Sequence, residues 1–375
     1  MVRRRTPRVK PGHEPFVGAA APHGPLPGLA EHPRRAEYLA LRRPRDLTVN
    51  VARRFPHAGR RRESDAGFLF ETIAGTVTLP WTMRCNQRCR YCAVRDGGPT
   101  APDPPEAYLA GLAAEARKGG FRKAFLVGGE PTARPGLAAF VRRLRALGME
   151  HAALGTNALA LAGPGVVDRL VEAGVDAFSV SLDSVDDEVQ AFLTRNPANP
   201  GRVARAVEAI ARREHIVLLF FALVCRQTLP GLERLVEHVD AVRGRGRARV
   251  GLCLTGLKPV GAAARHPELC ARFGEMRPWW EAALARARTL GLPLIDFNLP
   301  SCVFPGNEDR RWEHNIEEGV WNADLGMLFR APAYEREHVR VPGCADCVFA
   351  ECPGVYRGYV ERWGAAEFHA RRRRR

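Results

Sequence analysis

The chain has 375 residues, ten cysteines and a formal net charge of +16 at pH 7. This length allows one large domain with an appendage, or two domains. The sequence has no run of about 18 apolar residues and no apolar core behind its basic N-terminus, so we expect neither a membrane span nor a signal peptide.

The positive charge is concentrated at the two ends of the chain. Residues 1–66 contain 15 Lys+Arg against 6 Asp+Glu, and residues 371–375 are all arginine. The stretch 67–370 is nearly neutral, with 37 basic and 35 acidic residues. A nucleic-acid-binding protein carries its basic residues on a folded face, so this distribution argues against a nucleic-acid partner.

Composition divides the chain into four parts. Residues 1–66 contain nine prolines and no sustained periodicity, which predicts a loosely ordered basic extension. Residues 67–299 alternate apolar and amphipathic segments and form the predicted main domain. Residues 300–370 lose this pattern and contain cysteine, glycine and aromatic residues, which predicts a small extension held together by metal. An arginine tail, 371–375, follows.

The main domain alternates expected strands with expected helices. The strands are expected at 76–81, 123–127, 151–154, 177–182, 216–224, 248–254 and 294–297. The helices are expected at 104–118, 137–147, 166–173, 202–213, 232–242 and 275–290. This order favours a parallel sheet with helical crossovers. About six strand-helix repeats are too few for the closed eight-stranded barrel. We therefore predict an α/β fold with a partial (β/α)6 barrel, and a flat doubly wound sheet is the alternative.

Three cysteines follow the first expected strand at the spacing C-x3-C-x2-C. They are Cys85, Cys89 and Cys92, and no further cysteine occurs before Cys225. Three thiolates from one loop can hold three irons of a [4Fe–4S] cube, which leaves the fourth iron open to a ligand. The alternative is a structural zinc site that takes a distant fourth ligand. Grouped cysteines of this kind suit a reducing compartment, and we expect a cytoplasmic protein.

Polar and glycine residues follow the next three expected strands. Gly128-Gly129-Glu130-Pro131 follows the second, where glycines allow close backbone approach to a ligand and Glu130 offers a carboxylate. Asn157 ends the third strand, and Ser181 and Asp183 end the fourth. Each of these groups also has an ordinary interpretation as a turn or cap.

In this order, the cysteine loop and the strand-end residues resemble the radical S-adenosylmethionine (SAM) superfamily. The resemblance implies that the open iron binds SAM and that the matching glycines, Glu130 and Pro131 hold its amino group. It implies that polar groups at the next strand ends, Asn157, Ser181 and Asp183, hold its carboxylate and ribose. Tyr91 would lie beside the adenine or, alternatively, pack under the cluster loop. The implied reaction is reductive SAM cleavage to a 5′-deoxyadenosyl radical that abstracts hydrogen from a substrate, with an electron donor such as flavodoxin or ferredoxin.

A second cysteine set lies in the C-terminal extension. Its members are Cys302, Cys344, Cys347 and Cys352. Four thiolates are enough to close one site, and the spacing C-x2-C-x4-C resembles the SPASM/Twitch extension of radical SAM enzymes. This resemblance implies one auxiliary [4Fe–4S] cluster, and a tetrathiolate zinc site is the alternative.

Three further stretches deserve an expectation each. Cys253 alternates with apolar neighbours in an expected strand and is a candidate hydrogen donor or methyl carrier, although buried cysteine is usually a small apolar residue. Residues 258–261 should lie near the adenine or substrate by the family pattern. Residues 308–311, Glu-Asp-Arg-Arg, are expected to form a solvated loop.

The resemblance reaches the cofactors but not the substrate. Relatives with such an extension often modify ribosomally made peptides, so the leading hypothesis is a peptide precursor that is crosslinked, converted to a thioether or epimerised. The alternative is a dehydrogenase or mutase that acts on a small-molecule metabolite. A non-catalytic Fe–S or zinc interaction module is the third possibility, and it predicts no SAM cleavage.

Overall fold

The computed structural model describes residues 68–69, 72, 76–93, 102–118, 120–306, 311, 338–348, 352 and 354–371, and the backbone of two short strands at 48–50 and 320–322. Most of the predicted N-terminal extension and four of the five tail arginines lie outside the described residues. The boundaries drawn at 66, 299 and 370 therefore stay predictions.

Seven parallel strands form the centre of the molecule. They are β2 (Thr76–Thr82), β3 (Lys123–Gly128), β4 (His151–Thr156), β5 (Ala177–Ser181), β6 (Val217–Val224), β7 (Arg249–Gly256) and β8 (Leu294–Phe297). Each corresponds to one of the seven expected strands. The connecting helices are α3 (Glu106–Lys118), α4 (Leu137–Ala146), α5 (Val166–Ala173), α6 (Asp187–Thr194), α7 (Asn199–Ala211), α8 (Leu232–Arg245) and α9 (Phe273–Leu290).

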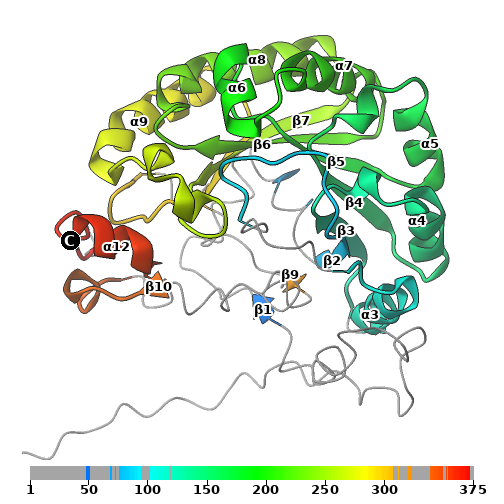
Figure 1. The fold of residues 1–375 in the computed structure, drawn as a ribbon, viewed down its shortest axis with the longest axis horizontal. Helices are drawn as coiled ribbons and strands as arrows, with labels where there is room; N and C mark the ends of the chain where they lie inside the picture. Colours follow the sequence, from blue (N-terminus) through cyan, green and yellow to red (C-terminus); the bar gives the residue numbers. More distant parts are fainter. Residues whose placement is uncertain are drawn as a thin grey trace, which may run out of the picture.

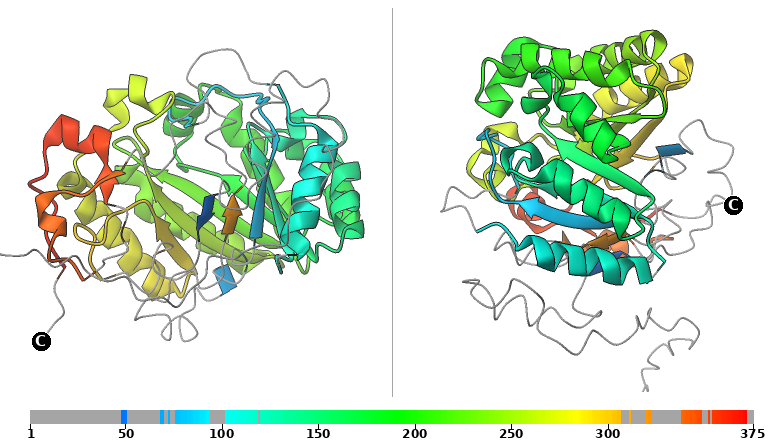
Figure 2. Two further views of the ribbon diagram at one scale, coloured as in Figure 1. Left: turned by 90° about the horizontal axis from the view of Figure 1, so that it is seen from below. Right: turned by 90° about the vertical axis from the view of Figure 1, so that its right-hand side faces the viewer.

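The sheet is curved and has helices along its outer side. Figure 1 shows α4, α5, α7, α8 and α9 following the convex side of the strands, and Figure 2 shows the same layering from two further directions. The hydrogen-bonded order is β1-β9-β2-β3-β4-β5-β6-β7-β8, so the described strands form an open sheet. This arrangement confirms the α/β partial barrel rather than the flat sheet with helices on both faces.

Alternating residues of the strands pack on the two faces of the sheet. Leu218 and Phe220 of β6 belong to the large core under the helices. Leu219 belongs instead to a small inner cluster with Leu69, Cys253 and Ile295. The period of two along β6 explains this division, because successive side chains of a strand point to opposite faces. The inner face of β6–β8 is thus filled by apolar residues, including a segment from before β2.

Among the described elements, three α-helices or strands before residue 338 and all elements of the C-terminal part were absent from the sequence-based expectations. Helix α6 is one of the first three. The other two are the short strands β1 (Thr48–Asn50) and β9 (Val320–Asn322): β9 pairs parallel with β2, and β1 pairs antiparallel with β9.

The C-terminal part contains helix α12 (Arg357–Trp363) and a small sheet of β10 (His338–Val339) and β11 (Val355–Tyr356). Figure 1 places α12 beside the part of the barrel that carries α9. An aromatic contact joins them, because Phe273 of α9 stacks on Tyr359 of α12 with 4.1 Å between ring centroids.

Candidate functional site

The first three cysteines lie in a loop directly after β2, and all three side chains are partly exposed. Gln87 lies between two of the cysteines, because its N–H donates to the Cys85 sulfur at 3.4 Å and its Oε1 accepts from the Cys89 thiol at 3.6 Å. Burial raises the pKa of the Cys89 thiol, and the charges of Cys92, Asp183 and Cys85 raise it further. A bound cation would offset this cost, since thiol ligands bind metals as thiolates.

The two glycines at the end of β3, Gly128 and Gly129, contact the start of the cysteine loop. A Cβ atom on Gly128 would stand 2.0 Å from the carbonyl oxygen of Thr82, and one on Gly129 would stand 2.1 Å from that of Arg84. The Gly129 N–H donates to Thr82 O at 2.7 Å, and the Glu130 N–H donates to Arg84 O at 2.7 Å. The close approach predicted for a ligand is made here by the protein's own backbone.

The Glu130 carboxylate lies in a buried hydrogen-bond network. Its Oε1 accepts from Thr132 N at 3.1 Å, Thr132 Oγ1 at 2.6 Å and Thr156 Oγ1 at 2.9 Å. Its Oε2 accepts from Asn157 N at 2.7 Å. Burial raises the pKa of Glu130, and these hydrogen bonds act in the opposite direction. The carboxylate therefore ties β4 to the short 3-10 helix η3 (Pro131–Ala133), of which Pro131 is the buried first residue.

Asn157 connects the end of β4 to the cysteine loop. Its Nδ2 donates to Asn86 Oδ1 at 2.7 Å and lies 3.8 Å from the Cys85 sulfur. Ser181, the last residue of β5, has a partly exposed side chain. Three of the candidate strand-end residues therefore contact the cysteine loop or the residues just before it: Gly129, Glu130 and Asn157.

Asp183 is buried below the loop, and the half-buried Tyr91 lies near it. The Asp183 Oδ1 accepts from Leu223 N at 3.0 Å, whereas its Oδ2 has no hydrogen-bond partner in the described part of the chain. Burial raises the pKa of Asp183 to about 6, although the Tyr91 hydroxyl and the Leu223 N–H act to lower it. The Tyr91 ring packs on a cluster that contains Cys225 and Leu269. These contacts correspond to the packing alternative for Tyr91.

The loop after β7 also packs on the cysteine loop. Gly261 has φ +60°, and a Cβ there would stand 2.6 Å from the carbonyl oxygen of Cys92. The Ala262 N–H donates to the same oxygen at 2.9 Å. Residues 258–261 therefore lie beside the third cysteine.

Helix α6 provides a support that the sequence analysis missed. The Arg90 N–H donates to Leu193 O at 2.8 Å, and its Nε donates to Phe192 O at 3.0 Å. The available signal was Asp186, whose side chain caps the helix by accepting from Glu188 N and Val189 N.

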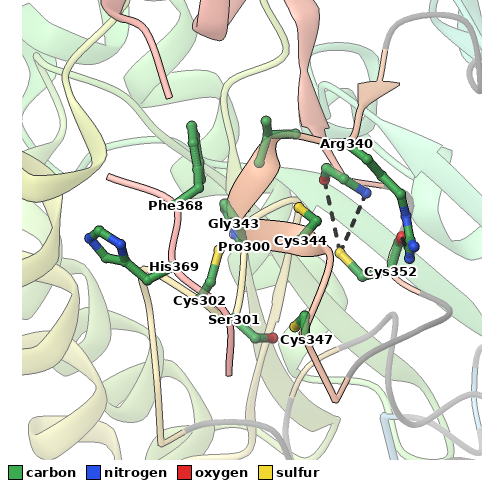
Figure 3. A pocket seen from close by; sticks show the side chains of 12 residues that line it. Pro300, Ser301, Cys302, Arg340, Gly343, Cys344, Cys347, Cys352, Phe368 and His369 are labelled. Carbon is green, nitrogen blue, oxygen red and sulfur yellow. Dashed lines mark hydrogen bonds between the residues drawn. The ribbon is translucent and has the colours of Figure 1, made fainter. Parts of the chain in front are cut away.

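The second cysteine set lines one pocket. Figure 3 shows the sulfurs of Cys302, Cys344, Cys347 and Cys352 arranged around a common space, although Cys302 comes from the turn after β8 and the others from 344–352. Burial raises the pKa of Cys302 to about 11, and the charges of the other three thiols raise it as well. Gly354, with φ +101°, lets its N–H donate to the Cys352 sulfur at 3.4 Å.

No three His, Cys, Asp or Glu side chains in the described part of the chain converge as the ligands of a single metal ion. The thiolates of an iron–sulfur cube bind different irons and stand farther apart than the ligands of one zinc ion, whose Zn–S bonds are about 2.3 Å. Both cysteine sets supply the thiolate donors that such a cube requires.

Cys253 lies on the inner face of β7 and is 2% exposed. Its neighbours in the inner cluster are Leu69, Leu219 and Ile295, so its surroundings are those of a small core residue. Gly251, two residues earlier, leaves the space that Leu69 fills, because a Cβ there would stand 2.6 Å from Leu69 Cδ2.

A cavity of about 410 Å³ lies between the loops that follow β6 and β7 and helix α12. Most of its lining is apolar, with Leu257, Phe273 and Met276 on the barrel side. Its charged lining residues are Glu361 and Arg362, which are neighbours of opposite sign. The cavity is large enough for a small ligand or a bulky side chain.

The fold and the strand-end site agree with the comparison to known families. Residues 79–239 match the model of the radical SAM superfamily. The matched range contains the cysteine loop, the Gly128–Pro131 turn and the ends of β4 and β5.

Curated relatives match over part of their length. The chain is 32% identical over 187 residues to the probable GTP 3′,8-cyclase of Methanopyrus kandleri, which covers 50% of this chain and 57% of that protein. The first three relatives are covered over roughly a third to three-fifths of their length.

Solved structures share the fold. Streptococcus suis SuiB bound to S-adenosylmethionine gives a TM-score of 0.54 at 13% identity, over 80% of this chain and 77% of that chain. SuiB bound to its precursor peptide SuiA gives 0.50 at 14% identity, over 60% and 49%. Among the described helices, none combines the length and hydropathy needed to cross a bilayer.

Proposed function

We propose that Cys85, Cys89 and Cys92 hold a [4Fe–4S] cluster with which the protein cleaves SAM. The observation that carries this proposal is the arrangement around the three thiols. The loop is fixed to the β3 turn through Gly129 and Glu130, and Asn157 lies 3.8 Å from the Cys85 sulfur. When bound, the cluster and SAM supply a 5′-deoxyadenosyl radical that abstracts hydrogen from the substrate.

The protein's own residues position the reactants. The close backbone contacts at Gly128, Gly129 and Gly261 hold the two ends of the cysteine loop. Asn157 and the partly exposed Ser181 are the strand-end groups available to SAM. Asp183 and Glu130 act one layer below, because both carboxylates are buried and hydrogen-bonded within the protein. Pre-organisation of this kind lowers the entropic cost of bringing reactants together.

The second cysteine set is the proposed site of one auxiliary [4Fe–4S] cluster in a SPASM/Twitch-like extension. Support comes from the four thiols that line one pocket although 41 residues separate Cys302 from Cys344. Four thiolates leave no iron open, which suits electron transfer rather than substrate binding. An electron donor such as flavodoxin or ferredoxin and a reducing location such as the cytoplasm complete the proposal.

A peptide is the proposed substrate. The apolar cavity between the loops after β6 and β7 and helix α12 supports this choice, because a triphosphate is recognised by several convergent Arg or Lys side chains. Here the charged lining residues are one Glu and one Arg, side by side. An apolar or aromatic side chain of a peptide matches this lining better. A nucleotide is the second candidate, and the relatives named GTP 3′,8-cyclases favour it.

Anaerobically reconstituted, reduced protein tests both candidates. Three samples contain SAM alone, SAM with GTP, and SAM with the product of any short reading frame encoded beside the gene. The peptide proposal expects 5′-deoxyadenosine and a peptide mass change in the third sample only. Formation of 5′-deoxyadenosine that depends on GTP would overturn the peptide proposal and favour the nucleotide as substrate. The variant Cys92→Ala serves as the inactive control, and an absence of 5′-deoxyadenosine from every sample would leave a non-catalytic module.

A further inference from the structure

A buried ion pair stands next to the second cysteine set. Arg311 is 1% exposed and Asp296, on β8, is 0% exposed. The guanidinium is bidentate, with Nε to Asp296 Oδ1 at 2.8 Å and NH2 to Oδ2 at 2.9 Å. The expectation of a solvated loop at 308–311 is wrong for Arg311, the one of these four residues that the structure describes.

The same guanidinium also holds the turn that carries Cys302. Its NH1 donates to Ser301 Oγ at 2.8 Å, and its NH2 donates to Phe304 O at 3.2 Å. These two acceptors lie immediately before and two residues after Cys302. A planar guanidinium offers five N–H donors in a fixed geometry, so one side chain can fix the strand and the turn together.

An aromatic cluster also supports the turn. Phe304 makes edge contacts with Phe273 at 5.5 Å and Trp280 at 5.2 Å, both from α9. Cys302 is thereby attached to the barrel. Cys344, Cys347 and Cys352 belong to the C-terminal extension, so the two parts of the chain supply the four thiols separately.

We propose that Arg311 is a positioning residue that holds Cys302 in place as the barrel's ligand to the auxiliary cluster. The inference rests on the auxiliary cluster of the proposed function. Burying two charges is costly unless their geometry is well satisfied, and breaking such a pair leaves an uncompensated charge. Without Arg311 the Ser301–Phe304 turn loses two hydrogen bonds, and the site keeps three thiolates and one open iron.

The first test uses the metal-free protein and therefore does not depend on the cluster. Alkylation of each cysteine by N-ethylmaleimide is followed by mass spectrometry in the parent chain and in Arg311→Met. Loss of the anchor should speed alkylation of Cys302 by about tenfold or more, because opening of the turn becomes easier. Alkylation of buried Cys225 should stay unchanged. Equal Cys302 rates in both proteins would overturn the proposal.

A matched control is available on the same loop. Arg288 of α9 donates to Gly306 O at 2.8 Å in an exposed hydrogen bond, four residues after Cys302. Arg288→Met should leave the alkylation of Cys302 within about twofold of the parent, as expected for a surface change. Arg311→Lys keeps the charge but loses the bidentate geometry, so its rate of Cys302 alkylation should lie between those of the parent and of Arg311→Met. This variant also provides the test if Arg311→Met fails to fold.

The second test uses Cys85→Ala/Cys89→Ala protein, in which only the auxiliary cluster can assemble. Ferricyanide takes one electron from a [4Fe–4S] cube that has an open iron. The oxidised cube then loses Fe²⁺ and becomes a three-iron cluster, which has its own electron paramagnetic resonance (EPR) signal. Adding Arg311→Met should produce this signal, as Cys302→Ala should, whereas the background with Arg311 and Cys302 intact should not produce it. An identical response with and without Arg311 overturns the positioning role. If the Cys85→Ala/Cys89→Ala protein binds no iron, the proposal of an auxiliary cluster is itself refuted.

Discussion

Glu130→Gln tests whether the Glu130 carboxylate is a part of the scaffold. If the glutamine oxygen takes the place of Oε1, its NH2 group faces the Asn157 N–H, which was bonded at 2.7 Å. An unsatisfied buried N–H costs about 1–3 kcal/mol. The three bonds to Oε1 also change from a charged to a neutral acceptor, which weakens each by about 1 kcal/mol. Removing a buried charge offsets part of this loss.

The net expectation is a loss of roughly 2 kcal/mol in the free energy of unfolding, or about 4–8 °C in Tm for a domain of this size. Thermal unfolding of the metal-free protein without SAM measures it. Glu115→Gln is the control, because Glu115 makes only an exposed pair with Lys118 on α3. Unchanged stability of Glu130→Gln, together with weaker SAM binding, would refute the scaffold role and return Glu130 to the SAM amino group.

Three further substitutions have defined outcomes. Gly129→Ala places a methyl group 2.1 Å from the Arg84 carbonyl oxygen and should prevent assembly of the first cluster, so that iron falls from about eight to about four per chain; full iron content would contradict this. Asp183→Asn should change the pH dependence of stability. The folded-state pKa of about 6 lies above the ordinary 3.8, so the Asp183 contribution is present at low pH and is lost as pH rises through 6. Relative to the variant, the wild-type free energy of unfolding should fall by about 3 kcal/mol between roughly pH 4 and 8, measured by denaturant titration. If both proteins show the same pH dependence, the raised pKa of Asp183 is excluded. Cys253→Ala should cost about 1 kcal/mol of stability and leave 5′-deoxyadenosine formation intact, whereas loss of substrate turnover alone would assign Cys253 a catalytic role.

The seven central strands could be predicted because each is a short apolar run bounded by glycine or polar residues. Periodicity of this kind depends only on neighbours in the sequence. Helix α6 was not predicted because its eight residues give only a short apolar face, and the capping residue Asp186 is its main sequence signal. Strands β1 and β9 escaped because each has three residues and depends on a partner far away in the chain.

Residue types were predictable at the site, but their partners were not. Gly128 and Gly129 were identified as places of close approach, yet the approaching group proved to be the backbone of Thr82–Arg84. Glu130 is bonded to Thr156, 26 residues later, and that pairing requires the β3–β4 register. Arg311 looks like a surface residue in a charged run, and only the position of Asp296 at the end of the barrel makes it a buried one.

The most direct test of the central claim is the EPR spectrum of reduced, anaerobically reconstituted protein before and after addition of SAM. Cysteines at 302, 344, 347 and 352 are replaced by alanine so that only the cluster at residues 85–92 contributes. A [4Fe–4S] signal that changes when SAM is added is the predicted result, because SAM binds the open iron. A signal unaffected by SAM, or zinc in place of iron at Cys85, Cys89 and Cys92, would contradict the account.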